Sequence, residues 1–537
     1  MKAVLAKFAL LAAASLLALP TFAATYYFAD CQAGAAPACV AGSNGNAGTS
    51  PGAPKQNLAG FKFPAGAGHV YRFARGGSFT DVYIDAPSGA TFEAYSPSWC
   101  SGACAESRPI LKARAKADGR GDDVLRFWFK RGITVRGLEL RGHGGGEGYG
   151  VMSQGSSDIT IDDLEISDFV IGIHVAYGYN GTVSEGVTIR NSTIRNNKAQ
   201  GFLGGAKGLM LENNRFDSNG GDNGTRDHNI YLSSGPNEVP GITVRGNTLT
   251  NNTAYAGGIC KAVALVGHGN MPNLTIENNT LTETASGAVC WGIAINGVTG
   301  SKVVQAFPGL VIRGNTVSIH GAGNVGITCD SCPDAVIENN TIVRTGDDGS
   351  FTGVHIPSGT PSKARGDLAD NNITVRNNTI HIEAPDRPTG ISLAPGSASD
   401  VVVSNLVLFG SRSNRAQCLQ TRGRSIQSFE AIDNNLCWRS GGEAFSWSDQ
   451  AQRLSDAQAA GFDQSSLAVD PGLSTLTQAA GAARGSVLAT ASPAIDAGHR
   501  TLSSPRDRAG VQRDAQPDIG AVERAGRPSA PPSLTVQ

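Results

Sequence analysis

The sequence has few charges, few aromatic residues and no excess of either charge sign. Charged residues make up 17% and aromatic residues 6% of the 537 residues, and 44 Lys and Arg against 45 Asp and Glu leave a net charge of −1. A coiled coil and a charged disordered chain need more charge, and most nucleic-acid-binding proteins need a basic excess. The composition therefore excludes these classes, and we expect no nucleic-acid partner.

Long apolar runs are also missing after the first 25 residues, so we expect no membrane span. Residues 1–23 differ from the rest, because Lys2 and Lys7 precede a short apolar run that ends in the small residue Ala23. This is the arrangement of a secretory signal peptide. The sequence thus predicts a secreted or periplasmic protein that matures at residue 24.

Ten cysteines follow the predicted signal peptide. An even number of cysteines in an exported chain favours disulfides over metal ligation. We expect local bridges between neighbours in sequence, namely 31 with 39, 100 with 104, 329 with 332 and 418 with 437, which leaves 260 with 290. The Cys329-x-x-Cys332 spacing also occurs in zinc and redox sites, but no second such pair exists in the sequence. We therefore interpret it as a structural bridge.

One pattern of eight residues recurs through the middle of the chain, at starts that lie 22 to 38 residues apart. It alternates apolar and polar residues, then has Asn or Gly, and ends in a short apolar stretch. Its copies are ITVRGLEL from Ile133, ITIDDLEI from Ile159, VTIRNSTI from Val187, LMLENNRF from Leu209, ITVRGNTL from Ile242, LTIENNTL from Leu274, LVIRGNTV from Leu310, AVIENNTI from Ala335, ITVRNNTI from Ile373 and VVVSNLVL from Val401. Alternation with period two predicts strands, and a repeat of this length predicts an array.

A second short strand recurs between these copies, as in GIHVAYG from Gly172 and NIYLSSG from Asn229. Two or three strands per coil, with inward aliphatic residues, describe a parallel β-helix whose coils bury their apolar faces on one another. The predicted fold class is therefore all-β. Its capping elements are expected at the two ends of the solenoid.

Seven asparagines fall at one place in this repeat: Asn191, Asn213, Asn247, Asn278, Asn315, Asn339 and Asn377. Asparagine tolerates the left-handed backbone of a turn, and stacked asparagines form hydrogen-bonded ladders. We expect both features here.

The chain divides into five predicted segments. Residues 1–23 are the signal peptide, 24–65 an N-terminal cap, 66–447 the β-helix, 448–525 a C-terminal helix and capping segment, and 526–537 a disordered tail with three prolines.

The two ends of the mature chain carry a resemblance to a known group. GTSPGAP at 48–54, FARGGSF at 73–79 and EAYSP at 93–97 look like the opening of secreted bacterial pectate-lyase-like proteins, and SPAIDAG at 492–498 with DIGAVE at 518–523 is similar to their closing segment. The resemblance implies a right-handed parallel β-helix. The superfamily includes polysaccharide lyases, uronate epimerases, glycoside hydrolases and binding proteins without activity.

For the lyases, the resemblance implies a uronic-acid polysaccharide and β-elimination, which needs a base, a cation for the carboxylate and an acid for the leaving oxygen. Aligning the second strands on their first inward apolar residue places Gln200, His228, Lys261 and Trp291 at one position of successive coils. Adjacent strands lie about 4.8 Å apart, so His228 and Lys261 would reach one sugar unit.

The candidate catalytic residues are His228, Tyr231, Lys261, Arg226 and Asp227. His228 or Tyr231 would serve as base or acid, Lys261 or Arg226 would neutralise the carboxylate, and Asp227 would orient a neighbour. The alternative is that His228 binds a turn and Tyr231 is an ordinary exposed strand residue. His174, His268 and His355 are weaker candidates.

Calcium serves many lyases of this fold and takes six to eight oxygen ligands. Asp217, Asp222 and Asp227 lie in one coil and Asp347-Asp348 in another, without a recognised ligand spacing. No cofactor is assigned, and Ca²⁺ stays open.

The leading hypothesis is a secreted polysaccharide lyase, a carbon–oxygen lyase whose partner is its polysaccharide substrate. The alternatives are a uronate C5-epimerase or glycoside hydrolase on the same fold, or a carbohydrate-binding surface solenoid without activity. Hydrolases of the polygalacturonase type carry an Asp-Asp pair that comes before a Gly-His-Gly motif. Here Gly267-His268-Gly269 precedes Asp347-Asp348, so this type of hydrolysis does not fit.

Overall fold

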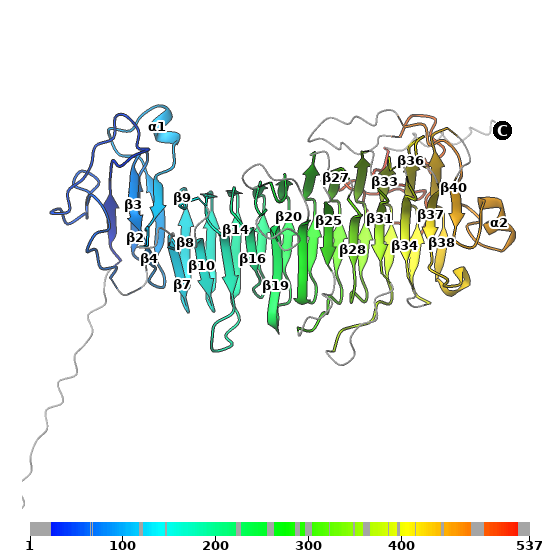
Figure 1. The fold of residues 1–537 in the computed structure, drawn as a ribbon, viewed down its shortest axis with the longest axis horizontal. Helices are drawn as coiled ribbons and strands as arrows, with labels where there is room; N and C mark the ends of the chain where they lie inside the picture. Colours follow the sequence, from blue (N-terminus) through cyan, green and yellow to red (C-terminus); the bar gives the residue numbers. More distant parts are fainter. Residues whose placement is uncertain are drawn as a thin grey trace, which may run out of the picture.

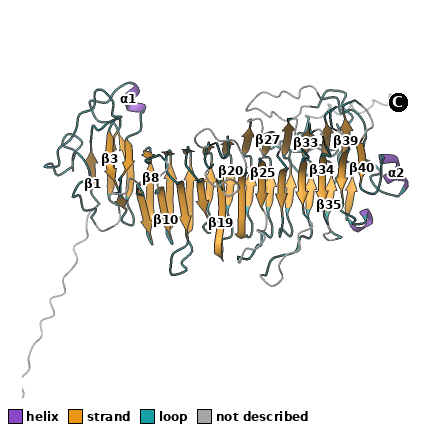
Figure 2. Ribbon diagram, in the orientation of Figure 1, coloured by secondary structure: helices purple, strands orange, loops and turns teal. Residues whose placement is uncertain are grey.

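Three parallel β-sheets run the length of the molecule, and each coil of the chain adds one strand to each of them (Figures 1 and 2). The computed structural model describes residues 23–64, 66, 68–116, 122–144, 148–221, 227–254, 262–284, 290–295, 303–321, 323–346, 349–357, 366–384, 386–394, 398–413, 415–441, 445–473 and 488–524. We name the sheets 1, 2 and 3 in the order in which a coil visits them.

Sheet 1 has fourteen strands: β1 (Thr25–Phe28), β2 (Val70–Ala74), β5 (Thr91–Tyr95), β8 (Arg131–Arg136), β11 (Ser157–Asp162), β14 (Glu185–Arg190), β17 (Met210–Glu212), β20 (Thr243–Arg245), β23 (Thr275–Glu277), β26 (Val311–Arg313), β29 (Val336–Glu338), β32 (Thr374–Arg376), β35 (Val401–Val403) and β38 (Ala431–Asp433). Sheet 2 has thirteen: β3 (Ser78–Val82), β6 (Ile110–Ala113), β9 (Glu139–Arg141), β12 (Glu165–Ser167), β15 (Thr193–Arg195), β18 (Arg215–Asp217), β21 (Thr248–Thr250), β24 (Thr280–Glu283), β27 (Thr316–His320), β30 (Thr341–Thr345), β33 (Thr379–Ile382), β36 (Leu406–Phe409) and β39 (Leu436–Arg439).

Sheet 3 also has thirteen strands: β4 (Ile84–Asp85), β7 (Leu125–Trp128), β10 (Tyr149–Gln154), β13 (Ile171–Ala176), β16 (Gln200–Gly204), β19 (His228–Glu238), β22 (Val263–Asn270), β25 (Trp291–Ile295), β28 (Val325–Cys329), β31 (Thr352–Ile356), β34 (Thr389–Leu393), β37 (Ala416–Gln420) and β40 (Phe445–Ser448). The helices are short: α1 (Ala103–Glu106), α2 (Leu454–Ala459) and the 3-10 helix η3 (Ile426–Ser428). The prediction of an all-β parallel β-helix is confirmed.

The core is a stack of inward aliphatic side chains, as the period-two alternation predicted. Ile159 of β11 pairs with Ile133 of β8 on one side and with Val187 of β14 on the other, and all three are fully buried. Each coil thus buries its apolar positions on the same positions of the next coil. This stacking gives the solenoid a continuous core.

The asparagines of the repeat occupy two adjacent positions, not the single place that the sequence predicted. Asn191, Asn213, Asn278, Asn339 and Asn377 have a positive φ between 52° and 56°. Asn247 and Asn315 lie one position later in their coils, because Gly246 and Gly314 take the left-handed position there. The prediction combined two positions of the repeat, the left-handed turn residue and the residue that follows it.

The later position forms the expected ladder inside the turn from sheet 1 to sheet 2. Each side-chain amide donates to the side-chain oxygen of the next coil at 2.9 to 3.1 Å, through Asn214, Asn247, Asn279, Asn315, Asn340, Asn378, Asn405 and Asn435. All of these side chains are buried. Their hydrogen bonds are thus satisfied by one another and by backbone carbonyls.

One register position of sheet 1, which is the last residue of each strand from β8 to β32, carries a second ladder that the sequence analysis missed. Opposite charges alternate in register along Arg72, Glu93, Arg136, Asp162, Arg190, Glu212, Arg245, Glu277, Arg313, Glu338 and Arg376. Arg245 and Glu212, for example, lie 2.7 Å apart, as do Arg313 and Glu277. A shift of one coil would place like charges opposite each other.

Both ends of the solenoid have distinct coverings. Phe28, Phe61 and Tyr71 stack at the N-terminal end, where Phe28 and Phe61 have ring centroids 5.1 Å apart. At the other end, Ala457 of α2 packs into the core, which agrees with the helix predicted within residues 448–525. Residues 1–22 and 525–537, with most of the predicted signal peptide and the whole predicted tail, lie outside the described residues.

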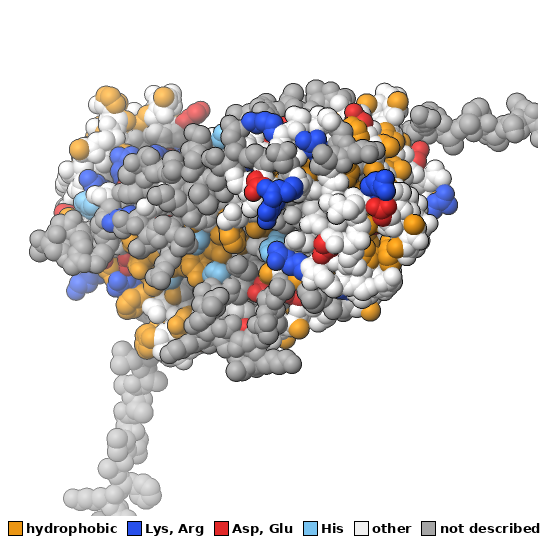
Figure 3. All heavy atoms as spheres, turned by 45° about the vertical axis from the view of Figure 1, so that its right-hand side comes forward, with side chains coloured by type: hydrophobic (Ala, Val, Ile, Leu, Met, Phe, Trp, Pro, Cys, Tyr) orange, Lys and Arg blue, Asp and Glu red, His pale blue; other side chains and the backbone are white. Residues whose placement is uncertain are grey.

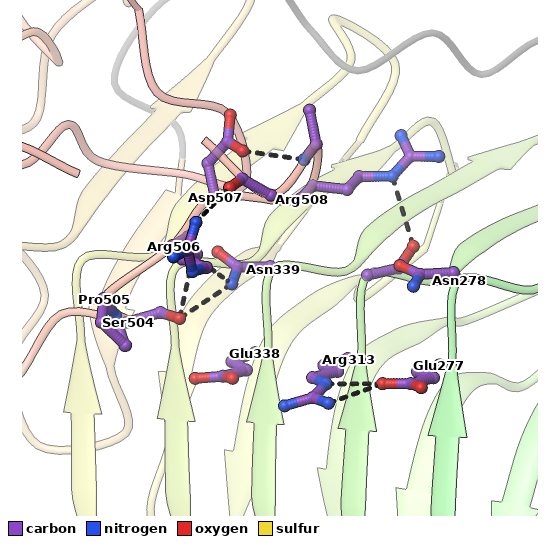
Figure 4. Close-up of a pocket in the computed structure, with 13 residues that line it drawn as sticks. Glu277, Asn278, Arg313, Glu338, Asn339, Ser504, Pro505, Arg506, Asp507 and Arg508 are labelled. Carbon is purple, nitrogen blue, oxygen red and sulfur yellow. Dashed lines mark hydrogen bonds and ion pairs between the residues drawn. The ribbon is translucent and has the colours of Figure 1, made fainter. Parts of the chain in front are cut away.

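The segment 488–524, which we call the strap, runs back along the side of the solenoid instead of over its end (Figures 1 and 4). Its buried Arg513 pairs with Glu523 at 2.6 Å and donates to Asn339 of the β29 coil at 3.0 Å. Ala521 N donates to Thr379 of β33 at 3.0 Å. The strap therefore ties several coils together along sheets 1 and 2.

Four of the predicted disulfides are present: Cys31–Cys39, Cys100–Cys104, Cys329–Cys332 and Cys418–Cys437. The pairing of 260 with 290 stays a prediction, because Cys260 lies outside the described residues. In the part of the chain that the structure describes, no helix is long and apolar enough to cross a membrane.

Candidate functional site

The strand register corrects one step of the sequence alignment on sheet 3. Gln200 pairs with His228 as predicted, but Ile230 pairs with Leu265, and Trp291 pairs with Val263. Val263 therefore occupies the position assigned to Lys261. The alignment failed by two residues because it took Val263 as the first inward residue of β22, whereas Leu265 is the one that stacks on Ile230 and Ile293.

Two of the five candidate residues, Lys261 and Arg226, lie outside the described residues. His228, Asp227 and Tyr231 lie at the start of β19, the longest strand of sheet 3. The structure thus places three of the candidates and leaves the two predicted cations as expectations.

His228 is 4% exposed and begins β19. Its Nδ1 donates to the carbonyl oxygen of Val263 on the next coil, at 2.8 Å. A carbonyl can only accept, so the proton of the neutral ring is on Nδ1 and the lone pair is on Nε2. His228 thus hydrogen-bonds the backbone of the next strand of sheet 3, β22, and this bond fixes the tautomer of its ring.

Burial lowers the pKa of His228 to about 4, the hydrogen bond to Val263 acts in the opposite direction, and the charge of His268 lowers the pKa further. The ring is therefore neutral at neutral pH. A neutral imidazole with a fixed Nδ1–H can accept a proton at Nε2.

Tyr231 lies between two histidines from adjacent coils. Its ring meets His228 edge-on at 5.3 Å and His268 edge-on at 5.5 Å between centroids. We call these three residues the His228 cluster. His268 was a weaker candidate in the sequence, and the pairing of Ser233 with His268 brings it beside Tyr231.

The backbone beside His228 is anchored by a second, shorter asparagine network. Asn219 Nδ2 donates to Asn229 Oδ1 at 2.8 Å, and Asn229 N donates to Asn252 Oδ1 at 2.6 Å. Asn252 Nδ2 in turn donates to the same Val263 carbonyl that holds His228, at 3.2 Å. The ring position is thus fixed by buried amides from two adjacent coils.

Asp227 precedes His228 and is 1% exposed. Its Oδ2 accepts a hydrogen bond from Gly221 N at 3.0 Å, which holds the start of the preceding loop. Its predicted role in orienting a neighbour stays a prediction.

A cavity of about 130 Å³ lies on sheet 3 toward the N-terminal coils, lined by His174, Ala176, Tyr177, Val183, Leu203, Ser233, Gly235 and Val239 among others. Burial lowers the pKa of His174 to about 4, so this ring is neutral too. His174 is two coils from Tyr231 in the register, through Leu203. His355 is four coils away on the other side and does not join the cluster.

The described ranges contain no group of three or more His, Cys, Asp or Glu side chains that could bind a metal ion such as calcium. Asp217 is bonded to Arg215 at 2.6 Å and to Asn251 at 3.1 Å. Asp222, Asp347 and Asp348 lie outside the described residues, as do any contacts they make.

A larger cavity, of about 630 Å³, lies between the strap and sheet 1 (Figure 4). Its charged groups belong to the alternating ladder and to the strap: Glu277, Arg313 and Glu338 from the coils, and Arg506, Asp507 and Arg508 from the strap. Glu277 pairs with Arg313, Glu338 pairs with Arg376 at 2.8 Å, and Asp507 accepts from backbone amides of the strap. The opposite charges are balanced within the cavity wall.

A family model described as the right handed beta helix region matches residues 125–303. The chain is a right-handed parallel β-helix protein. The matched part of the β-helix contains β7 to β25 and hence the whole His228 cluster.

Three solved structures are similar to this chain at low identity. The β-helix is 14% identical to the Dettilon tailspike protein, with a TM-score of 0.43 over 66% of this chain and 62% of that one. It is 16% identical to an alginate lyase from a Paenibacillus species, with a TM-score of 0.34 over 55% of this chain and 91% of that one. It is 10% identical to XylC, solved with xylose, with a TM-score of 0.47 over 93% and 98% of the two chains.

The chain thus spans less than two thirds of the tailspike. No curated protein sequence matches this β-helix significantly.

Proposed function

We propose that this β-helix is an exported polysaccharide lyase that cleaves a uronic-acid polymer by β-elimination at the His228 cluster. The observation that carries the proposal is the neutral, buried His228, whose Nδ1–H is held by the Val263 carbonyl. Four disulfides and the signal-like residues 1–23 support export, because disulfides persist in oxidising compartments.

In this reaction, Nε2 of His228 takes the proton from C5 of the uronate, and the C5–H electron pair forms the C4–C5 double bond. The C4–O bond breaks, and the hydroxyl of Tyr231 gives its proton to the leaving oxygen. Charge builds on the uronate carboxylate during proton removal, so a cation is needed beside it. Lys261 or Arg226 takes this role in the proposal.

An epimerase shares the first step and differs in the second. If a proton returns to C5 from the opposite face, the C4–O bond stays intact and the configuration at C5 is inverted. The products therefore distinguish the two reactions.

The test uses purified protein from residue 24 onward with alginate, pectate, glucuronan and glycosaminoglycans, with and without calcium. Ultraviolet absorbance reports unsaturated uronate, and a parallel assay counts reducing ends. We expect absorbance to rise on one polymer. Reducing ends without absorbance would show a hydrolase, and deuterium uptake at C5 without cleavage would show an epimerase.

The matched variants are His228→Gln and His355→Gln. Burial lowers the pKa of both histidines to about 4, and both lie on sheet 3, but only His228 belongs to the cluster. General acid–base groups contribute about 10²- to 10⁴-fold, so we expect kcat to fall at least about 100-fold in the first variant. Equal activities of the two variants would overturn the site assignment.

A further inference from the structure

Exposed aromatic side chains gather on sheet 3 near its N-terminal strands. Among the described residues, Trp128 is 40%, Phe129 36%, Tyr177 43% and Tyr179 80% exposed. They come from the end of β7 and from the loop that follows β13, two coils further along, with β10 between them. Contiguous apolar surface of this kind marks an interaction site more often than scattered single residues do.

Phe129 is held in an unfavourable backbone conformation to reach this surface. Its φ is 53°, in the left-handed region that bulky residues avoid. Glycines of the next two coils give its ring room, since a Cβ at Gly155 or Gly178 would lie 2.8 Å or 2.4 Å from the ring. The Tyr179 ring meets it edge-on at 5.0 Å.

Tyr177 extends this surface toward the His228 cluster. A Cβ at Gly235 of β19 would lie 2.5 Å from the Tyr177 ring, so this tyrosine lies over the strand that begins with His228. Tyr177 also lines the 130 Å³ cavity together with His174 and Ser233. The cavity therefore reaches from the coil of Tyr177 to β19, the strand of the His228 cluster.

Guanidinium groups accompany the aromatic rings. The guanidinium of Arg126 lies 4.2 Å from the centroid of Trp128, and it is held there by Asp123 at 3.1 Å. Arg114 lies 4.6 Å from the ring of Tyr83 in the same region and pairs with Asp122 at 2.5 Å. Flat apolar rings next to guanidinium groups suit a chain of uronic acids, whose pyranose faces stack on aromatics and whose carboxylates bind Arg.

The spacing fits a polymer laid along the helix axis. Five strand-to-strand steps separate β7 from β22, and each step is about 4.8 Å, which gives about 24 Å in all. One hexose unit is about as long as one such step. Trp128 and Phe129 thus lie several sugar units away from the His228 cluster, and Tyr177 lies nearer to it.

We propose that Trp128, Phe129, Tyr177 and Tyr179 form a binding platform for the distal part of the acidic polysaccharide that the His228 cluster cleaves, an inference that rests on the proposed function. The platform binds sugar units that do not react. It therefore lowers KM for long chains and leaves kcat and the cleavage of short oligosaccharides unchanged.

The test combines Phe129→Asn with Tyr179→Ser. Asparagine tolerates a positive φ, so this variant removes the ring without straining the backbone. The control is Val469→Ser with Val511→Ser, which removes two exposed apolar side chains outside sheet 3. Melting temperatures check that both proteins fold.

The readouts are KM and kcat on the cleaved polymer and on its shortest cleaved oligosaccharide, and retardation of the protein in gels that contain alginate or polygalacturonate. We expect KM on the polymer to rise at least about tenfold in the platform variant alone. Cleavage with an unchanged KM would overturn the platform and leave the proposed function standing. Retardation without cleavage by the wild type, lost in the platform variant, would overturn the lyase and leave the platform, whereas no retardation and no cleavage of any polymer would overturn both.

Discussion

Sheets 1 and 3 belong to the same coils but differ in what they present to solvent. Along sheet 1, one register position repeats an alternation of Arg with Glu or Asp from Arg72 to Arg376, and most of these charges are paired. Along sheet 3, the position of Tyr231 is taken by a different residue type on almost every coil, such as His174, Leu203, Val266 and Ala294.

The difference separates the two tasks of a solenoid. A residue that repeats with the coil stabilises the stacking, because every copy meets the same neighbour. A residue that departs from the repeat does not contribute to this stacking in the same way. Clusters of histidine and tyrosine on sheet 3 are therefore candidates for function. The longest strand, β19, interrupts the regular pattern at this place.

Among the repeating features, we expect the largest loss of stability when one step of the asparagine ladder beside sheet 1 is removed. Asn279→Ala removes the side-chain oxygen that accepts from the buried backbone N–H of Asn247 at 2.9 Å, and it also removes the side-chain donor to the carbonyl of Val244. Each orphaned buried group costs about 1–3 kcal/mol, so we expect a loss of about 3 kcal/mol in the free energy of unfolding, measured by denaturant titration.

The neighbouring Asn278 supplies the control for this variant. It is exposed and has a φ of 56°, which glycine adopts freely. Asn278→Gly should therefore change the free energy of unfolding by much less than Asn279→Ala. Equal losses would mean that the ladder adds nothing to the turn.

The pH dependence of turnover tests whether His228 on sheet 3 acts as the base. A base must be unprotonated, and the pKa of His228 is lowered to about 4 by burial. We expect kcat/KM on the cleaved polymer to show no loss from His228 between about pH 8 and pH 5 and to fall about tenfold per unit below about pH 4, which corresponds to about 1.4 kcal/mol per unit. An acidic limb centred near 6.5, the ordinary value for histidine, would exclude His228 as the base.

The smallest effect is expected from the alternating charges of sheet 1. Arg245 and Glu212 are 2.7 Å apart, but the Arg245 side chain is 42% exposed. A double-mutant cycle with Arg245→Met and Glu212→Gln should give a coupling of about 0.5 kcal/mol that weakens at 1 M salt. A coupling above about 2 kcal/mol would show that the ladder stabilises the fold as strongly as the buried asparagines do.

The sequence alone was enough to predict the parallel strands, the four described disulfides and the presence of asparagine ladders. Repeats reveal these features because each coil meets a copy of itself, so a local pattern specifies its own partner. The alternating charges were visible in the same copies, as in ITVRGNTL followed by LTIENNTL, and comparing the fourth residues of successive copies would have revealed them.

The neighbours within the candidate site were decided by the tertiary structure. His228 and His268 are separated by a loop whose length does not repeat, so counting residues could not give the register of β19 with β22, and it misplaced Lys261. Only the stacking of Leu265 on Ile230 fixes that register, because a buried aliphatic side chain must meet another one in the core. The sequence by itself thus determined the solenoid and the residue types on its surface, whereas the packing of the core decided which of those residues face one another.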